Sequence, residues 1–306
     1  SNAGDVNGDG YDDILVGAGW GDPGGGSNAG ETYVVFGSGG TFSASLDLDT
    51  LDGSNGFRLN GIDEDDLSGI SVSTAGDVNG DGYDDILIGA YQADPDGDSA
   101  AGETYVVFGS AAGFAASLDL GSLDGTNGFR LDGIDVDDHS GYSVSNAGDV
   151  NGDGYDDILV GAHGADPGGV QCAGETYVVF GSGSGFTAVL DLSTLNGDNG
   201  FRLDGIDWCS TSGYSVSTAG DVNGDGYADI LVGAKQADNN TGETYVIFGR
   251  EGEFGTSLDL STLDGSNGFR LDGIDADLGS QSGASVSTAG DVNGDGYADI
   301  LVGAYG

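Results

Sequence analysis

Acidic and amide side chains recur at fixed spacing in this sequence, in a pattern suited to a hard metal ion. The nonapeptide D-V-N-G-D-G-Y-(D/A)-D occurs five times, starting at Asp5, Asp77, Asp149, Asp221 and Asp291. Oxygen ligands on alternate residues, with glycines that allow a sharp turn, are typical of Ca²⁺ sites in proteins. The sequence therefore predicts a calcium loop in each copy.

The copies themselves indicate which positions carry ligands. In the last two copies the eighth position is alanine, at Ala228 and Ala298, whereas the ninth stays aspartate. The ninth position is therefore predicted as a ligand, and the eighth as dispensable for the loop. The full set comprises the side chains of positions one, three, five and nine and the backbone carbonyl of position seven. These residues are Asp5, Asn7, Asp9, Tyr11 and Asp13; Asp77, Asn79, Asp81, Tyr83 and Asp85; Asp149, Asn151, Asp153, Tyr155 and Asp157; Asp221, Asn223, Asp225, Tyr227 and Asp229; and Asp291, Asn293, Asp295, Tyr297 and Asp299.

Two other calcium motifs and a metal-free turn are the alternatives to such a loop. An EF-hand needs a carboxylate at position twelve followed by a helix, but position twelve is here an apolar residue such as Val16 or Ile88. An RTX β-roll needs short nonapeptides in unbroken tandem, which this chain lacks. A metal-free Asp/Asn/Gly turn would explain one copy. Five matched copies favour calcium, with one ion per repeat and up to five in all.

Internal repeats organise the whole chain. The loops are 72 residues apart, except the last, which follows after 70, and the markers G-F-R-L-(N/D)-G-I-D and G-E-T-Y-V-(V/I)-F-G recur four times each. In the second unit, alternation and apolar runs predict four short strands, A to D, at residues 70–75, 86–88, 104–108 and 129–134. Strands B and C are apolar on both faces, which indicates sheets stacked against neighbouring sheets.

This pattern predicts an all-β fold, a β-propeller of four-stranded antiparallel blades with four 72-residue units and a partial fifth. Residues 1–306 are expected to form a single domain. The first unit is predicted to lack strand A, and the last to lack strands C and D. Three arrangements of the ends are open: residues 284–289 close a four-bladed ring as strand A of the first blade, the terminal strands join a second copy head to tail, or both ends belong to a longer array. Closure within the chain is favoured because it leaves the fewest open edges, although it gives strand B at residues 300–302 no place.

The charge balance excludes several partners. The chain has 52 acidic and 6 basic residues and a net charge of −46, so nucleic acid and anionic membrane surfaces are poor partners. No stretch approaches the roughly 20 apolar residues of a membrane helix, so membrane insertion is not expected. Four of the basic residues lie between apolar positions on strand D, and we expect them to pair with carboxylates in a structural role. They are Arg58, Arg130, Arg202 and Arg270.

Residues 140–162, S-G-Y-S-V-S-N-A-G-D-V-N-G-D-G-Y-D-D-I-L-V-G-A, resemble the FG-GAP repeat of integrin α-subunit propellers and, still more, bacterial secreted proteins that carry such repeats. The resemblance covers essentially the whole chain. It implies calcium in the A–B loop of each blade, a secreted or cell-surface location, and adhesion or recognition as the role. Integrin propellers have seven blades, whereas this chain has four units and a partial fifth. The inserted metal-dependent adhesion domain is absent too, so integrin-style ligand capture does not carry over.

In an up-and-down blade, the A–B loops lie on one face of the propeller, and the B–C and D–A loops lie on the other. Both tryptophans, histidines and cysteines and the single lysine fall in B–C or D–A loops: Trp20, His139, His163, Cys172, Trp208, Cys209 and Lys235. The most variable position follows each Gly-Ala pair, at Gly19, Tyr91, His163, Lys235 and Tyr305. We call the face formed by these loops the variable face. Either it has drifted without constraint, or it recognises an extracellular protein or glycan. Cys172 and Cys209 are either a disulfide or two free thiols.

Catalysis finds little support, because the histidines are not repeated and neither cysteine lies in a nucleophile motif. The sequence favours a calcium-stabilised extracellular binding or adhesion module, with no catalytic residues. The alternative is a structural surface protein that self-assembles through its incomplete terminal units and binds no separate ligand. A propeller enzyme is the least favoured candidate.

Overall fold

The computed structural model describes residues 1–274 and 279–305, and nearly all of its regular structure is β-strand. In chain order the strands are β1 (Asn2–Gly4), β2 (Asp13–Ala18), β3 (Glu31–Val35), β4 (Gly56–Asn60), β5 (Ser71–Gly76), β6 (Asp85–Ala90), β7 (Glu103–Val107), β8 (Ser117–Asp119), β9 (Gly128–Asp132), β10 (Ser143–Gly148), β11 (Asp157–Ala162), β12 (Glu175–Val179), β13 (Val189–Asp191), β14 (Gly200–Asp204), β15 (Ser212–Gly220), β16 (Asp229–Ala234), β17 (Glu243–Ile247), β18 (Ser257–Asp259), β19 (Gly268–Asp272), β20 (Ser285–Gly290) and β21 (Asp299–Gly303). The short helix α1 spans Ala237–Asn240, and single 3-10 turns lie at Pro23–Gly25, Leu48–Thr50, Pro95–Gly97, Leu120–Ser122, Pro167–Gly169, Leu192–Thr194 and Leu260–Thr262.

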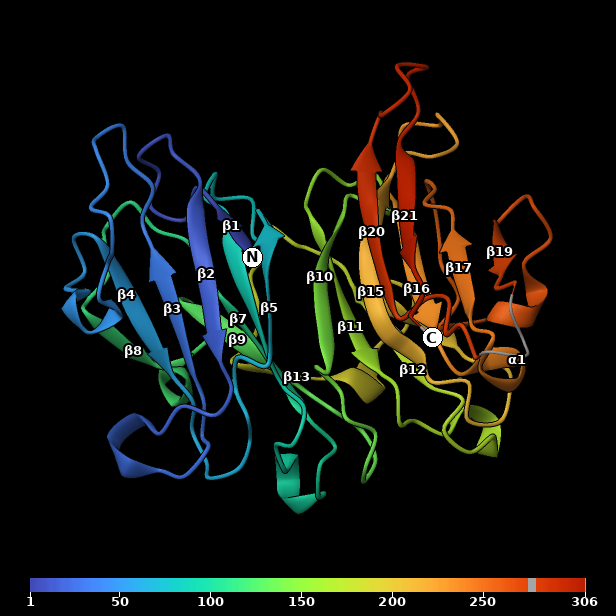
Figure 1. Ribbon diagram of the computed structural model, residues 1–306, viewed down its shortest axis with the longest axis horizontal. Helices are drawn as coiled ribbons and strands as arrows, with labels where there is room; N and C mark the ends of the chain where they lie inside the picture. Colours follow the sequence, from blue (N-terminus) through green and yellow to red (C-terminus); the bar gives the residue numbers. More distant parts are fainter. Residues whose placement is uncertain (275–278, 306) are drawn as a thin grey trace.

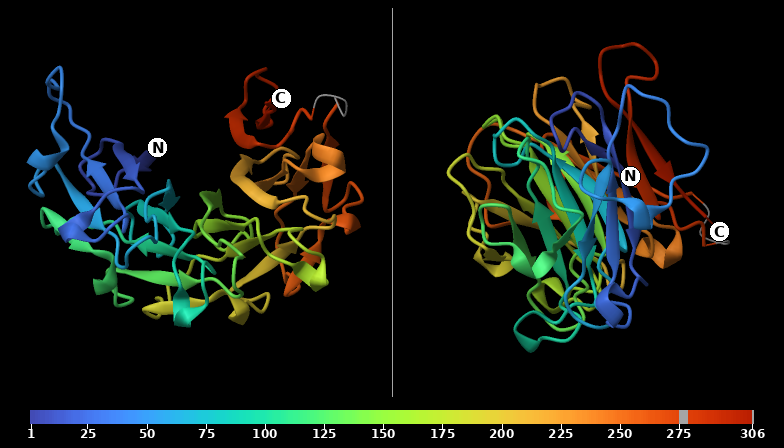
Figure 2. Two further views of the ribbon diagram at one scale, coloured as in Figure 1. Left: turned by 60° about the horizontal axis from the view of Figure 1, so that its bottom comes forward. Right: turned by 90° about the vertical axis from the view of Figure 1, so that its left-hand side faces the viewer.

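The strands form one sheet per repeat. The sheet orders are β1-β2-β3-β4-β8, β5-β6-β7-β9-β13, β10-β11-β12-β14-β18, β15-β16-β17-β19 and β20-β21. Strands A to D of the second unit pair antiparallel, as the sequence predicts, and the first, third and fourth units repeat this order. The sheets follow one another round an open arc, with the N-terminal and C-terminal sheets at its two ends (Figures 1 and 2). The A strands of successive sheets, β1, β5, β10, β15 and β20, lie next to one another.

Burial on both faces of the inner strands explains why the sheets stack as blades. Every residue of β6 is buried. Ile86 and Ile88 pack against the first blade, whereas Leu87 packs against the third. Alternation along one strand therefore supplies two separate cores, one on each side of the sheet. The all-β, blade-type fold predicted from the apolar runs of strands B and C is confirmed.

A fifth strand, which the sequence does not predict, joins each of the first three blades to the next. The C–D segment of the second unit contributes β8, which pairs parallel with β4 at the outer edge of the first blade. Beside it, the ring of Phe114 stacks on Phe57 with ring centroids 4.1 Å apart. The third and fourth units reach back in the same way, through β13 and β18. Each D strand covered in this way is no longer an open edge.

Two predictions about the chain ends are wrong. The first unit does have a strand A, because β1 pairs with β2. The segment at residues 284–289 does not complete the first blade. It forms β20, which pairs with β21 in register Val286↔Val302 and so gives the strand B at residues 300–302 its place. The hairpin of β20 and β21 forms in preference to ring closure because the two strands are neighbours in sequence, so that little loop entropy is lost. Both strands also pack on the fourth blade.

Candidate functional site

The five Asp-rich loops connect strand A to strand B and share one geometry. In the second loop, Asp77 accepts hydrogen bonds from the backbone N–H groups of Asp81 and Gly82, each at 2.9 Å. Asn79 Oδ1 accepts from the N–H of Asp81 at 2.8 Å, and Asp81 Oδ1 accepts from the N–H of Tyr83 at 3.0 Å. The same four bonds recur in the other loops. The first, third and fifth side chains thus shape the turn as side-chain caps.

The ninth residue of the loop lies deeper than the other predicted ligands. Asp85 is fully buried, and its two oxygens accept from the N–H groups of Val78, at 3.1 Å, and Gly109, at 2.9 Å. Burial raises the pKa of Asp85 to about 8, and the charges of Asp81 and Asp77 act in the same direction. A cation near these three carboxylates would relieve their repulsion. Asp13, Asp157 and Asp229 repeat this arrangement.

The predicted ligands of each copy therefore share one loop, but their oxygens are directed to backbone N–H groups. Within residues 1–274 and 279–305, no three His, Cys, Asp or Glu side chains form a group arranged to hold a metal ion. The donor set itself, carboxylates with one amide and one backbone carbonyl, is the set that Ca²⁺ prefers. The chemistry of the residues fits calcium, and the ligand assignment stays a prediction.

Successive loops are linked to one another, which the sequence does not reveal. Asp84, at position eight of the second loop, accepts from the N–H of Asp5 in the first loop at 2.7 Å. Asp156 does the same for Asp77 at 3.0 Å. Where alanine replaces this aspartate, the backbone bond from Ala228 N to Asp149 O, at 3.0 Å, still joins the loops. Position eight, predicted to be dispensable for the loop, thus contributes to contacts between blades.

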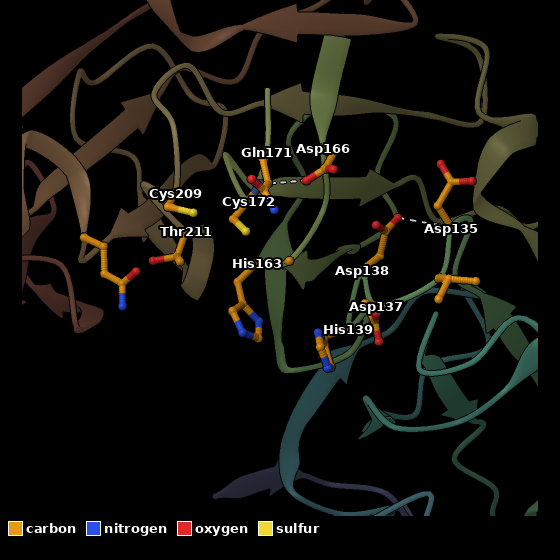
Figure 3. A pocket seen from close by; sticks show the side chains of 13 residues that line it. Asp135, Asp137, Asp138, His139, His163, Asp166, Gln171, Cys172, Cys209 and Thr211 are labelled. Carbon is orange, nitrogen blue, oxygen red and sulfur yellow. Dashed lines mark hydrogen bonds between the residues drawn. The ribbon is translucent and has the colours of Figure 1, made fainter. Parts of the chain in front are cut away.

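On the variable face, a cavity of about 620 Å³ opens between the loops of the second and third units (Figure 3). Both histidines and both cysteines line it, as His139, His163, Cys172 and Cys209. The two cysteines lie at one side of the cavity, and the two histidines lie together at another. The structure therefore brings together four of the rare residues that sequence analysis placed on one face.

An aromatic cluster adjoins this cavity. The ring of Tyr142 lies 4.3 Å from that of His163, and its hydroxyl bonds to that of Tyr214 at 3.0 Å. The Nζ atom of Lys235 lies 3.3 Å from the centre of the Tyr214 ring, a cation–π contact. Tyr91 packs edge-on against Tyr142 at 5.3 Å. We define the aromatic cluster as Tyr91, His139, Tyr142, His163, Tyr214 and Lys235.

Two members of the cluster, Tyr142 and Tyr214, were missed from the sequence. Tyr142 stands just before β10, and Tyr214 lies near the start of β15; the equivalent residue of the second unit is Ile70. This difference in residue type between otherwise similar repeats was the signal from which the two tyrosines could have been found. Burial and, to a smaller extent, the nearby His139 and Lys235 together lower the pKa of His163 to about 4, so this imidazole is neutral at physiological pH.

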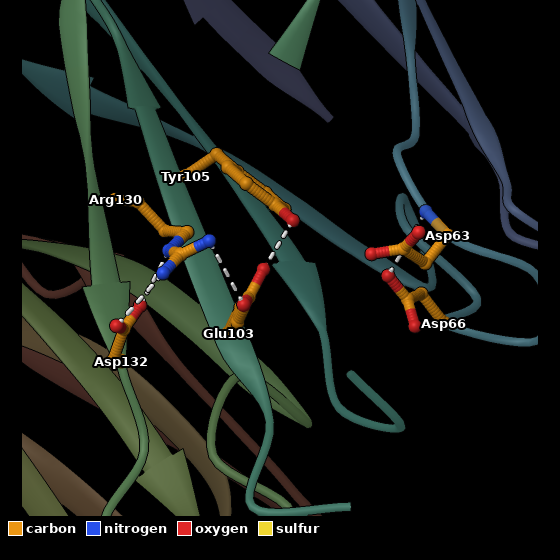
Figure 4. A network of polar contacts seen from close by, with 6 residues as sticks. All are labelled: Asp63, Asp66, Glu103, Tyr105, Arg130 and Asp132. Atoms are coloured by element: carbon orange, nitrogen blue, oxygen red, sulfur yellow. Dashed lines mark hydrogen bonds and ion pairs between the residues drawn. The ribbon is translucent and has the colours of Figure 1, made fainter. Parts of the chain in front are cut away.

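Ion pairs on the D strands confirm the structural role predicted for the repeated arginines. Arg130 binds Glu103 at 3.2 Å and Asp132 at 2.5 Å, and Tyr105 donates its hydroxyl proton to Glu103 (Figure 4). Burial raises the pKa of Glu103, and the bond from Tyr105 and the charge of Arg130 oppose that shift. The equivalent arginines pair with Glu31, Glu175 and Glu243.

Comparison with known proteins identifies the repeat. The FG-GAP repeat family matches residues 2–35, 68–107, 140–179, 212–247 and 282–306. The chain belongs to the FG-GAP repeat family. Each matched segment contains one Asp-rich loop and the strands A and B beside it, and the first four also include strand C, whereas strand D lies outside every match.

Among curated proteins, this FG-GAP chain is similar to integrin α-subunits. It is 30% identical to integrin alpha-PS2 of Drosophila melanogaster over 80% of its length and 32% identical to integrin alpha pat-2 of Caenorhabditis elegans over 78%. It is 29% identical to integrin alpha-4 of Xenopus laevis over 58%. The match covers 16%, 18% and 15% of these relatives, respectively. The bacterial likeness stays a prediction. Among the residues that the structure describes, no helix is both long and apolar enough to span a membrane.

Proposed function

We propose that this FG-GAP chain is a calcium-stabilised extracellular module, secreted or at the cell surface, that recognises a protein or glycan through its variable face. Its similarity to integrin α-subunits over most of its length supports a binding role of this type. The five loops would each hold one Ca²⁺ through positions one, three, five, seven and nine. Calcium there would neutralise clustered carboxylates and hold the A–B turns.

The observation that carries the recognition role is the concentration of rare residues on one face of a strongly repetitive chain. Core positions are nearly identical from unit to unit, whereas the cavity and the aromatic cluster are assembled from residues that differ. Aromatic side chains supply large contact area at low entropic cost and are enriched in binding interfaces. Trp20 and Trp208 add to this face, with 69% and 71% of their surfaces exposed.

A binding screen with matched variants tests this proposal. The full chain, in calcium, is applied to immobilised surface glycans and matrix proteins, and each hit is re-measured with Tyr214→Ala and Trp208→Ala. The control is Val189→Ala, which removes an exposed apolar side chain on the outer edge, away from the variable face. We expect at least tenfold weaker binding for the two face variants and no change for the control. Binding that survives both face substitutions, or the absence of any hit, would overturn the proposal.

Self-assembly is the second candidate, and the end blades favour it over a monomer without partners. In the inner blades, phenylalanines from neighbouring units stack in pairs, as Phe129 does on Phe186 at 4.2 Å. The counterparts of these two residues at the ends of the arc, Phe269 and Phe42, are 36% and 66% exposed. A second copy would cover them. Light scattering at several concentrations in calcium discriminates: growth of oligomers that Phe42→Ser abolishes supports assembly, whereas a strict monomer excludes it.

A further inference from the structure

The B–C and D–A loops of each unit are joined by backbone hydrogen bonds at one recurring place. In the third unit, Cys209 N donates to Gln171 O at 2.8 Å, and Thr211 N donates to Cys172 O at 3.1 Å. In the first unit the same two bonds link Asp65 N to Ser27 O and Leu67 N to Asn28 O, at 2.9 and 3.1 Å. Cys172 and Cys209 therefore occupy the positions that Asn28 and Asp65 occupy in the first unit.

Side chains at these two positions meet. In the first unit, Asn28 Nδ2 donates to Asp65 Oδ1 at 2.8 Å. In the third unit, the Cys209 thiol lies close enough to Cys172 to raise the pKa of that thiol, and both side chains lie at the same side of the cavity (Figure 3). The backbone holds them there firmly, because Cys172 and Cys209 both have positive φ, 49° and 51°, a conformation that side-chain-bearing residues adopt only where the surroundings impose it. The side-chain hydrogen bond of the first unit is thus replaced by a pair of thiols at the equivalent positions of the third unit.

We propose that Cys172 and Cys209 are an oxidisable pair whose disulfide fastens the B–C loop of the third unit to the D–A loop that leaves it. The bond would form one wall of the cavity on the variable face. It is independent of the identity of any ligand and goes beyond the recognition role proposed above. The disulfide would link these two loops covalently, whereas the first unit links the same positions by a hydrogen bond between side chains.

The oxidant we name is a small-molecule disulfide such as oxidised glutathione, which reaches the pair because both cysteines line the open cavity. One thiol loses its proton, and its thiolate attacks a sulfur of the small disulfide, releasing one small thiolate. The second protein thiolate then attacks the mixed disulfide and releases the other. The protein pair is oxidised by two electrons, and the small disulfide takes them up together with two protons. The contact with Cys209, with burial, raises the pKa of Cys172 to about 11, so the reaction should accelerate as the pH rises.

The test compares the full chain after treatment with oxidised glutathione and with a thiol reductant. We expect the oxidised protein to lose two hydrogens by intact mass, to show no free thiols when denatured, and to remain one chain in size. Its melting temperature should exceed that of the reduced protein by about 5–10 °C, from the loop closed between the two cysteines. The variant Cys172→Ala should melt alike under both treatments.

A transplanted pair gives an independent check on the geometry. Asn28→Cys with Asp65→Cys, in a chain that also carries Cys172→Ala and Cys209→Ala, should oxidise to the same internal bond. Ala100→Cys with Cys209 retained and Cys172→Ala places the thiols in different units and should not. Two persistent thiols in the natural chain after oxidation, or cross-linked dimers in place of an internal bond, would overturn the proposal.

Discussion

The ring of Tyr155 lies directly over Gly80, so that a Cβ on this glycine would sit 2.3 Å from Cε1 of the ring. Tyr155 belongs to the third Asp-rich loop and Gly80 to the second. Tyr83 covers Gly8, and Tyr227 covers Gly152, in the same way. The loops are therefore not independent turns, because each is covered by the tyrosine of the next.

This contact predicts that Gly80→Ala is much more damaging than a glycine change two residues away. Gly80 has φ +74° and meets the tyrosine ring, whereas Gly82 has φ +90° and faces open space among the described residues. We expect about 3 kcal/mol of destabilisation for Gly80→Ala, from backbone strain plus overpacking, and about 1 kcal/mol for Gly82→Ala, from strain alone. Denaturant unfolding measures both. Equal effects would show that the interblade contact contributes nothing.

The ion-pair network between strands C and D of the second blade predicts strong coupling between Arg130 and Glu103. Arg130→Met leaves Glu103 buried without its cation, and we expect a loss of about 3 kcal/mol in unfolding free energy. The double variant Arg130→Met with Glu103→Gln removes the stranded charge and should recover a large part of that loss. A double-mutant cycle by chemical denaturation gives the coupling. Additive losses would contradict the network.

Two buried aspartates outside the five Asp-rich loops predict that the stability of the fold depends on pH. Burial raises the pKa of Asp66 and of Asp138 to about 7, and Glu103 and Glu175 add to these shifts. Because the pKa in the folded state exceeds the unfolded value, stability is fully present at pH values below the unfolded pKa and is lost as the pH rises through 7. Between pH 5.5 and 8, the deprotonation of each of these two carboxyl groups would lower the free energy of unfolding by about 2 kcal/mol.

The matched variants for this prediction are Asp66→Asn and Asp138→Asn, which keep the shape and remove the titration. Thermal unfolding across this pH range should show the natural chain losing stability toward pH 8 and the double variant losing distinctly less. A double variant with the same pH profile as the natural chain would assign the effect elsewhere.

How much could be predicted from the sequence depends on the range of the interaction concerned. The strands of each blade were predictable because continuous apolar runs, such as residues 86–88, indicate a strand that is buried on both faces. The outer strand β8 was not, because three residues, Ser117–Asp119, carry no periodic signal, and their partner β4 lies in another unit.

The candidate site shows the same division. The spacing of Asp77, Asn79 and Asp81 identified the loops, since their hydrogen bonds are local. The meeting of Tyr142 with His163 and Tyr214 depends on how neighbouring blades stack, and no spacing within one repeat encodes it. Whether Cys172 and Cys209 meet was open for another reason: both belong to the third unit, but they lie on separate loops that only the folded chain brings together.

The most direct test of the account is thermal unfolding with calcium and with chelator. At tenfold excess over a dissociation constant of about 10⁻³ M, each calcium site contributes roughly 1.4 kcal/mol, so several sites together approach the stability of a whole domain. Without calcium the clustered carboxylates also repel one another. The account predicts that chelator lowers the melting temperature by more than about 10 °C and that added calcium restores it. An unchanged melting temperature would contradict the claim that calcium in the five loops holds this fold together.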